Sequence, residues 1–398
     1  MIDNPNFHRN RALAKYASTE WKNSQIGIND LNIEISQASS DAMPNTIFDQ
    51  YHKLVYPKVT GIKHLVFGNS TVNLEKIESK LIFPGLIGSQ VLMLAPRFFQ
   101  DQLGPELAAE LTNYGVQVST LLGAYLIPPF LIDIPNRFKT SAARRMGLSV
   151  GQSDPSEDLY FVADELNKRA DAAEIDFDEA KSLSADAVRS YHQKIYGFAS
   201  APAKVFFDEG KPNTTVPLHY NTILHQITAY RDDFPELLAH EQAHAQGIRT
   251  ERDAEVFGMV SQIESDNQSV QYLGYLRWLS SYLLQANFSD DEGNQIAKSQ
   301  IMQELQLNPR TTSDIEKRLA SIKIITGVET NPAEGETVSV DKSQKNKSAL
   351  EGFMSDLKMK LLGQGSTTEA YVISPLEIMH SYRLQVEKNN PGLRKKVS

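Results

Sequence analysis

The chain has 398 residues, a formal net charge of −9 and no cysteine. This length is enough for one large hydrophobic core or two modest ones. Without cysteine the chain can form no disulfide, thiolate zinc site or cysteine nucleophile, so any metal must be bound by His, Asp or Glu. No basic run dominates the sequence, and this argues against a nucleic-acid partner.

The N-terminal region contains two apolar stretches but no predicted secretory signal, because no apolar core follows the charges of residues 1–21. The stretches at 81–96 and 111–132 contain no charged residue. A membrane-spanning helix needs about 20 mostly apolar residues. The first stretch is short for this purpose, and the second contains several polar residues and the pair Pro128-Pro129. The two stretches therefore predict either a pair of buried core helices or a membrane hairpin.

The charges that flank these stretches favour the hairpin. Lysine and arginine residues precede the first stretch and follow the second, whereas the connection between them is acidic. Such an asymmetry is expected when both ends of a hairpin lie in the cytoplasm. We therefore predict a protein of the cytoplasm or of the inner membrane, with the membrane as a candidate partner.

Composition divides the chain into three parts. Residues 1–146 are expected to form an N-terminal helical region, which is membrane-associated if the hairpin is correct. Residues 147–290 are expected to form a core that carries the motif described below, and residues 291–398 a C-terminal helical region. A polar, turn-rich segment near 326–348 predicts a flexible loop.

The spacing of apolar residues predicts the secondary structure of the core. Apolar residues lie three and four apart at 158–175 and 184–197, which is the period of a helix, and helices are expected again from Phe234. Short β-branched runs and turn residues at 197–232 predict a few strands or extended segments. Near the end of the chain, the segment SPLEIMHSYRLQVEK predicts another helix. The predicted fold class is therefore α+β, mainly α.

The motif with a chemical meaning is His-Glu-Gln-Ala-His at 240–244. Residues four apart on a helix lie on one face, so His240 and His244 can bind the same ion. Glu241 lies one step round the helix and can reach a metal-bound water without being a ligand. Zinc accepts imidazole nitrogen, leaves one position for water in catalytic sites, and lowers the pKa of that water towards about 7. The spacing therefore predicts a Zn2+ site with Glu241 as the general base.

The flanking residues suit a helix that ends at a turn. Asp232 and Asp233 can cap its start, and Pro235 suits its first turn. Gly247 can adopt the left-handed conformation that ends a helix, and Thr250 can cap a second helix that follows.

The second helix is expected to supply the third metal ligand. A catalytic zinc commonly uses two His and one Glu. Glu251, just past the turn, is the first candidate, followed by Glu255 and then Asp253. If Glu251 binds zinc, Glu255 can hydrogen-bond one of the His ligands instead.

Two residues upstream of the motif are weaker candidates. His225 and Tyr230 lie in the extended run before the metal helix, where an edge strand could bind a peptide by β-addition. Either side chain could stabilise the oxyanion of the reaction. The alternative for each is a buried polar residue satisfied by the backbone. The alternative for the motif itself is an exposed helix with two surface histidines.

The residues around the motif resemble a bacterial family of inferred zinc metallopeptidases, catalogued as a domain of unknown function and usually membrane-anchored. The family pattern is H-E-x-A-H-x-x-G followed by E-x-x-A, which is matched here by His240, Glu241, Ala243, His244, Gly247, Glu251 and Ala254. The resemblance spans roughly residues 110–385, although only the metal motif is specific. It implies Glu251 as the third ligand and proteolysis of an unestablished substrate. The family often has Asn at the position of Glu255.

We therefore predict a zincin-type zinc metallopeptidase that hydrolyses the peptide bonds of a peptide or protein substrate. One alternative is a zinc hydrolase that uses the same ligands on a non-peptide substrate. Another is a non-catalytic helical protein that binds zinc or regulates a partner. A membrane-anchored scaffold is a third alternative.

Overall fold

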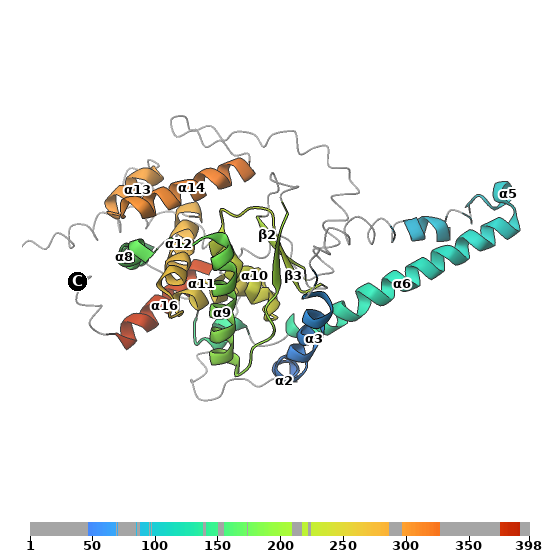
Figure 1. The fold of residues 1–398 in the computed structure, drawn as a ribbon, viewed down its shortest axis with the longest axis horizontal. Helices are drawn as coiled ribbons and strands as arrows, with labels where there is room; N and C mark the ends of the chain where they lie inside the picture. Colours follow the sequence, from blue (N-terminus) through green and yellow to red (C-terminus); the bar gives the residue numbers. More distant parts are fainter. Residues whose placement is uncertain are drawn as a thin grey trace, which may run out of the picture.

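The computed structural model shows a mainly helical α+β protein with a small three-stranded mixed sheet (Figure 1). The predicted fold class, α+β and mainly α, is confirmed. The structure describes residues 47–68, 70, 85, 88–94, 96, 98–137, 141–149, 155–172, 174–208, 217–221, 224–285, 297–326 and 375–390.

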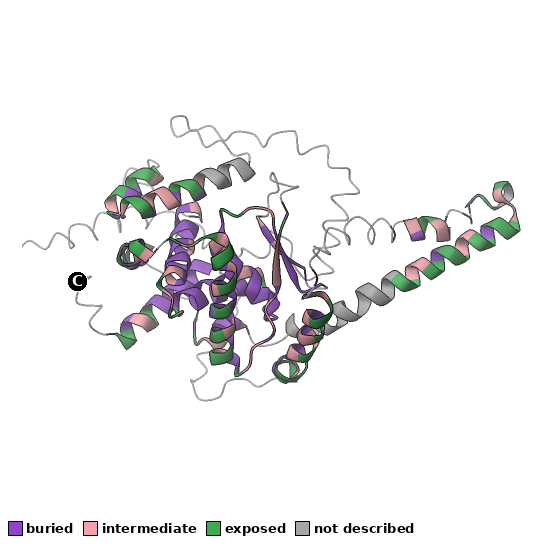
Figure 2. Ribbon diagram, viewed as in Figure 1, coloured by how far each residue is buried: buried purple, intermediate pink, exposed green. Residues whose placement is uncertain are grey.

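Four helices form the centre of the protein: α9 (Phe177–Tyr196), α10 (Leu238–Ala245), α11 (Glu251–Ile263) and α12 (Gln268–Gln285). The side chain of Asp176 caps α9 by accepting the backbone N–H of Glu179 at 2.7 Å, and Gly197 ends it in the left-handed conformation. Helix α11 packs against both α10 and α12 and is buried from Asp253 onward. Figure 2 shows the buried residues concentrated on these central helices.

The sheet contains β1 (Lys204–Phe207), β2 (Leu218–Asn221) and β3 (Gln226–Ala229) in the order β1-β3-β2. Strand β3 pairs in parallel with β1 and antiparallel with β2. Its four residues are all buried, as expected of the middle strand. The prediction of a few short strands at 197–232 is confirmed.

Helix α10 lies between two hydrophobic clusters. Ala239 and Ala243, four residues apart, belong to a large cluster formed by the helices. Leu238 and Ala245, seven residues apart, belong to a smaller cluster that includes the buried side chains of the sheet. Because residues spaced by three or four share a helix face, these two faces leave a third for His240 and His244.

The remaining helices of the body surround this centre: α8 (Pro155–Arg169), η3 (Ala170–Ala172), α13 (Lys298–Glu304), α14 (Pro309–Thr326) and α16 (Pro375–Asn389). A buried polar network holds α16 against α8. Asp158 accepts hydrogen bonds from Tyr282, from His380 at 3.0 Å and from Arg383 at 2.6 Å. Asp158 and Arg383 are both buried, so each offsets the charge of the other. The helices predicted at 158–175 and near the C-terminus are confirmed as α8 and α16.

The N-terminal region contributes α2 (Ile47–Leu54), α3 (Tyr56–Lys63), the π-helix η2 (His64–Gly68), α5 (Gln100–Leu103), α6 (Pro105–Arg137) and α7 (Ala142–Arg145). The Tyr56 hydroxyl donates to the carbonyl of Ala245 at 3.1 Å, and Arg145 pairs with Asp49 at 2.8 Å. The first contact attaches α3 to the body, and the second links α2 to α7. Helix α6 instead extends away from it, and its described side chains are mostly exposed (Figures 1 and 2).

The membrane prediction concerns α6 and the stretch before it. The stretch at 111–132 lies on α6, whose side chains beyond residue 121 are not described, and part of the stretch at 81–96 lies outside the described residues. No helix in the described part of the chain combines the length and the apolar character that crossing a membrane requires. Membrane association, cellular location and the three-part division of the chain stay predictions. Nearly all of the loop predicted at 326–348 also lies outside the described residues.

Candidate metal centre

The start of the metal helix differs from the prediction. A short 3-10 helix, η4 (Pro235–Leu237), precedes α10. Its N-cap residue is Phe234, which makes no side-chain capping bond and is buried in the smaller hydrophobic cluster. The predicted caps at Asp232 and Asp233 are therefore wrong. Asp233 is instead held by the guanidinium of Arg231, and burial of Phe234 fixes the entry of the chain.

A tight turn joins α10 to α11. Gly247 ends α10 with a φ of 84°, a conformation that favours glycine. Thr250 Oγ1 accepts the backbone N–H of Asp253 at 3.1 Å and so caps α11. Both of these predictions are confirmed. The turn folds α11 back along α10 and places Glu251 in its first turn, facing the histidines.

Gly258 lets the two helices approach each other closely. A Cβ atom at this position would lie 2.9 Å from the backbone nitrogen of His240 and 3.0 Å from the carbonyl carbon of Ala239. Any side chain would therefore push α11 away from the part of α10 that carries the motif. The separation of α10 and α11 depends on this glycine.

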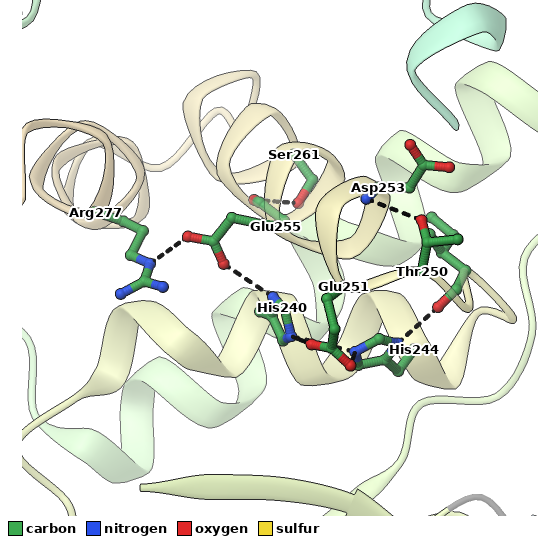
Figure 3. Close-up of polar contacts among 10 residues, drawn as sticks. His240, His244, Thr250, Glu251, Asp253, Glu255, Ser261 and Arg277 are labelled. Atoms are coloured by element: carbon green, nitrogen blue, oxygen red, sulfur yellow. Dashed lines mark hydrogen bonds and ion pairs between the residues drawn. The ribbon is translucent and has the colours of Figure 1, made fainter. Parts of the chain in front are cut away.

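Three side chains from these helices converge on one point (Figure 3). His240 Nε2 lies 3.2 Å from His244 Nε2 and 3.1 Å from Glu251 Oε2, and His244 Nε2 lies 3.5 Å from Glu251 Oε1. Tetrahedral ligands placed about 2.05 Å from a zinc ion are about 3.3 Å apart. The two imidazole nitrogens have about this separation, and each lies close to one oxygen of the Glu251 carboxylate. One ligand atom from each residue lies within 4.8 Å of the others, so the three residues, called the His2Glu group below, form a possible metal site.

Both histidines are held through the ring nitrogen that faces away from the group. His240 Nδ1 donates to Glu255 Oε2 at 2.9 Å, and His244 Nδ1 donates to the carbonyl of Ile248 at 2.7 Å. With the proton on Nδ1, the lone pair on each Nε2 points towards the group, as metal binding requires. Glu255 is fixed in turn by Arg277, whose Nε donates to Glu255 Oε1 at 2.5 Å (Figure 3).

The electrostatics of the group favour a cation. Burial alone would raise the pKa of Glu251, but His244 and His240 lower it far below its usual value. Burial also opposes ionisation of Glu255, yet Arg277 and His240 lower its pKa to about 2. Burial would lower the pKa of His240, but hydrogen bonds with Glu251 and Glu255 hold it well above its usual value. All three shifts have the sign expected of a site that attracts positive charge.

The acidic candidates occupy different positions around the group. Glu241 is buried next to His240, and its charge contributes to the raised pKa of that ring. Asp253 points elsewhere, since its Oδ2 accepts a backbone N–H from α7 at 3.3 Å. Glu255 hydrogen-bonds His240. Of the three candidates for the third ligand, Glu251 is the one whose carboxylate joins the two imidazoles.

His225 and Tyr230 are not members of the His2Glu group. His225 is fully buried, its Nε2 donates to the carbonyl of Ala201 at 2.9 Å, and its Nδ1 accepts from the hydroxyl of Tyr220 at 2.8 Å. Burial lowers the pKa of His225 to about 3, so the ring is neutral and its single N–H is engaged. In this arrangement it has no N–H to offer an oxyanion. Tyr230 is half-buried just after β3, and its role stays a prediction.

A family model matches the part of the chain that carries this site. The match covers residues 51–327 of 398, and the family is described as Protein of unknown function (DUF3810). The chain belongs to the DUF3810 family. No curated protein and no solved structure matches it. The DUF3810 description names no activity, although the matched region contains the whole His2Glu group.

Two glutamines of the DUF3810 region position α10, and no motif reveals them. Gln242 Oε1 accepts the N–H of Ala203 at 3.0 Å, and its Nε2 donates to the carbonyl of Ala203 at 2.8 Å. Gln246 makes the same pair of bonds with Ser200, at 2.7 and 3.3 Å. These bonds tie α10 to the segment that leads into β1. The spacing of four between the glutamines, parallel to that of the histidines, is the signal in the sequence that could have indicated a second polar face.

Proposed function

We propose that this protein is a zinc-dependent metallopeptidase whose ion is held by His240, His244 and Glu251. The observation that carries the proposal is the convergence of two imidazole Nε2 atoms and one carboxylate from consecutive helices. Two His and one Glu leave a fourth position open, which is typical of catalytic rather than structural zinc sites. The absence of cysteine is consistent with a nitrogen and oxygen ligand set.

Glu241 is the general base in this proposal. A bound zinc ion would polarise the scissile carbonyl and lower the pKa of the attacking water towards about 7. Glu241 would accept a proton from the attacking water and pass it to the leaving amine. Its burial beside His240 keeps this proton transfer away from bulk water. Glu255 and the carbonyl of Ile248 keep the two imidazoles oriented during the reaction.

A peptide substrate suits the strand that lies beside the metal helix. Strand β2 contacts α10 and, among the described strands, occupies an outer position of the sheet. An outer strand offers backbone N–H and C=O groups that can pair with an extended peptide. A peptide added at β2 would run alongside α10, with Tyr230 as the candidate for contacting the oxyanion. This combination of metal helix and outer strand supports the zincin type as the finer fold class.

Two alternatives use the same residues. A zinc hydrolase acting on a non-peptide ester or amide would show the same dependence on metal, and an ester and amide panel tested beside a peptide library separates it from a peptidase. A non-catalytic protein would bind zinc with no open coordination position. A ligand set of two His and one Glu is typical of catalytic zinc sites, and this favours the two catalytic functions over the non-catalytic one.

The deciding experiment combines metal analysis with three variants. The wild-type protein should bind about one zinc ion per chain and cleave members of a quenched peptide library. His240→Ala should lose the metal, whereas Glu241→Gln should keep it and lose hydrolysis. Glu179→Gln, at an exposed position on α9, is the matched control and should behave as wild type. Full hydrolysis by Glu241→Gln refutes the mechanism, and a wild-type protein that cannot be loaded with zinc refutes the proposal.

A further inference from the structure

Helix α12 carries a single charged residue, Arg277, among its 18 residues. The residues on either side, Leu276 and Trp278, are buried in the large hydrophobic cluster. A cation in such a helix is costly unless a partner offsets its charge. One such partner is Glu255 of α11, whose Oε1 lies 2.5 Å from Arg277 Nε.

Glu255 connects Arg277 to the proposed metal ligands (Figure 3). Its second oxygen, Oε2, accepts a hydrogen bond from His240 Nδ1 at 2.9 Å. One carboxylate therefore serves two donors that come from different helices, α10 and α12. Rotation of the carboxylate towards either donor would weaken its bond to the other. The position of Arg277 thus restricts the plane in which Glu255 can hold the His240 ring.

We propose that Arg277 is a positioning residue of the metal site, which acts through Glu255 to keep His240 Nε2 directed at the ion. The proposal rests on the proposed zinc site but not on peptidase activity. Without Arg277, the Glu255 carboxylate loses the donor that fixes one of its oxygens and the charge that offsets its own. The His240 ring is then held less firmly, and the affinity for zinc falls.

The size of the effect follows from the place of Arg277 in this series of contacts. Removing a residue that hydrogen-bonds a metal ligand typically weakens metal binding about 10–100-fold. Glu255 is such a residue, and Arg277 acts one hydrogen bond further from the ion. Arg277→Met, which removes the charge and the donors but keeps the length of the side chain, should therefore weaken zinc binding about 10-fold. Arg277→Lys keeps the charge and should recover part of the loss.

The test measures zinc affinity of the full chain by competition with a chromophoric chelator. Arg169→Met is the matched control, because Arg169 is also half-buried, pairs with Glu165 at 2.6 Å and contacts α12 through Gln271 at 2.6 Å. Its partners are Glu165 and Gln271 rather than Glu255, so its loss should leave zinc affinity unchanged. An equal loss of affinity in Arg277→Met and Arg169→Met would show a general effect of stability and overturn the proposal.

A double variant distinguishes positioning from a separate structural role. If Arg277 acts through Glu255, then Glu255→Ala, which removes the side-chain link altogether, and the double variant Glu255→Ala/Arg277→Met should bind zinc with the same affinity. Additive losses, or wild-type affinity in Arg277→Met, overturn the proposal. If Arg277→Met does not fold, Arg277→Gln carries the same expectations. Failure of the wild-type protein to bind zinc would instead overturn the zinc site itself.

Discussion

Gln242 lies between the two histidines of the motif and holds α10 to the segment that enters the sheet. Its amide group makes two hydrogen bonds with the backbone of Ala203, at 3.0 and 2.8 Å, and both residues are buried. Replacing Gln242 by Met keeps the length and the apolar stem of the side chain. The substitution leaves the N–H and the carbonyl of Ala203 without their partners.

The expected cost follows from these two backbone groups. A buried donor or acceptor that loses its partner costs about 1–3 kcal/mol, so Gln242→Met should lower the free energy of unfolding by about 3 kcal/mol. Urea denaturation followed by the fluorescence of the buried Trp278 measures the loss. Gln303→Met, at an exposed position on α13, is the matched control and should change stability by less than about 0.5 kcal/mol. A loss below about 1 kcal/mol for Gln242→Met would refute the reasoning, because Ala203 would then have other partners.

Three further predictions concern the surroundings of the site. Gly258→Ala should lower stability by about 1–3 kcal/mol and weaken zinc binding, because its Cβ would lie 2.9 Å from His240 N; an unchanged thermal midpoint and affinity would contradict this. The pKa of His225 is lowered from 6.5 to about 3 on folding, so the unfolded chain binds the proton at a higher pH than the folded chain does. The contribution of this residue to the free energy of unfolding is therefore fully present above about pH 6.5 and falls by up to about 1.4 kcal/mol per pH unit down to about pH 3. Urea titrations above and below about pH 6.5 should show this loss of stability in the wild type and a smaller loss in His225→Gln. Equal pH profiles for the two proteins would contradict the prediction. Zinc at about 1,000 times its Kd should stabilise the metal-free protein by about 4 kcal/mol, and the same shift in His244→Ala would place the ion elsewhere.

The parts of the site that depend on neighbouring residues could be predicted from the sequence. Two histidines four apart share a helix face whatever surrounds them. Gly247 and Thr250 act through their own backbone conformation and through a hydrogen bond to a residue three positions away. Together these short-range rules give the helix, the turn and the place of Glu251 at the start of the next helix.

The parts that failed, or could not be predicted, depend on contacts between distant segments. The sequence predicts that Asp232 and Asp233 cap the helix. Instead, Phe234 precedes its first turn and is buried in a hydrophobic cluster that includes residues of the sheet. His225 donates a hydrogen bond to Ala201, which is 24 positions away in the sequence, and Glu255 accepts one from Arg277, which is 22 positions away. A sequence pattern shows that such groups need partners, but only the packing of the helices decides which partners they find.

The charges at the site explain why substitutions of Glu251 and Glu255 should have different effects on zinc affinity. Glu241, Glu251 and Glu255 lie close to the histidines, and Arg277 offsets one of their three charges. With neutral imidazoles, one divalent cation would balance the two negative charges that remain. Its binding would lower the free-energy cost of burying these carboxylates. Glu251→Gln removes the carboxylate of the proposed third ligand and its charge together, whereas Glu255→Gln removes a charge and weakens one hydrogen bond. We expect the second variant to lose about 10–100-fold in zinc affinity and the first to lose more, as measured by chelator competition. Equal losses would mean that Glu251 acts through its charge alone and does not coordinate the ion.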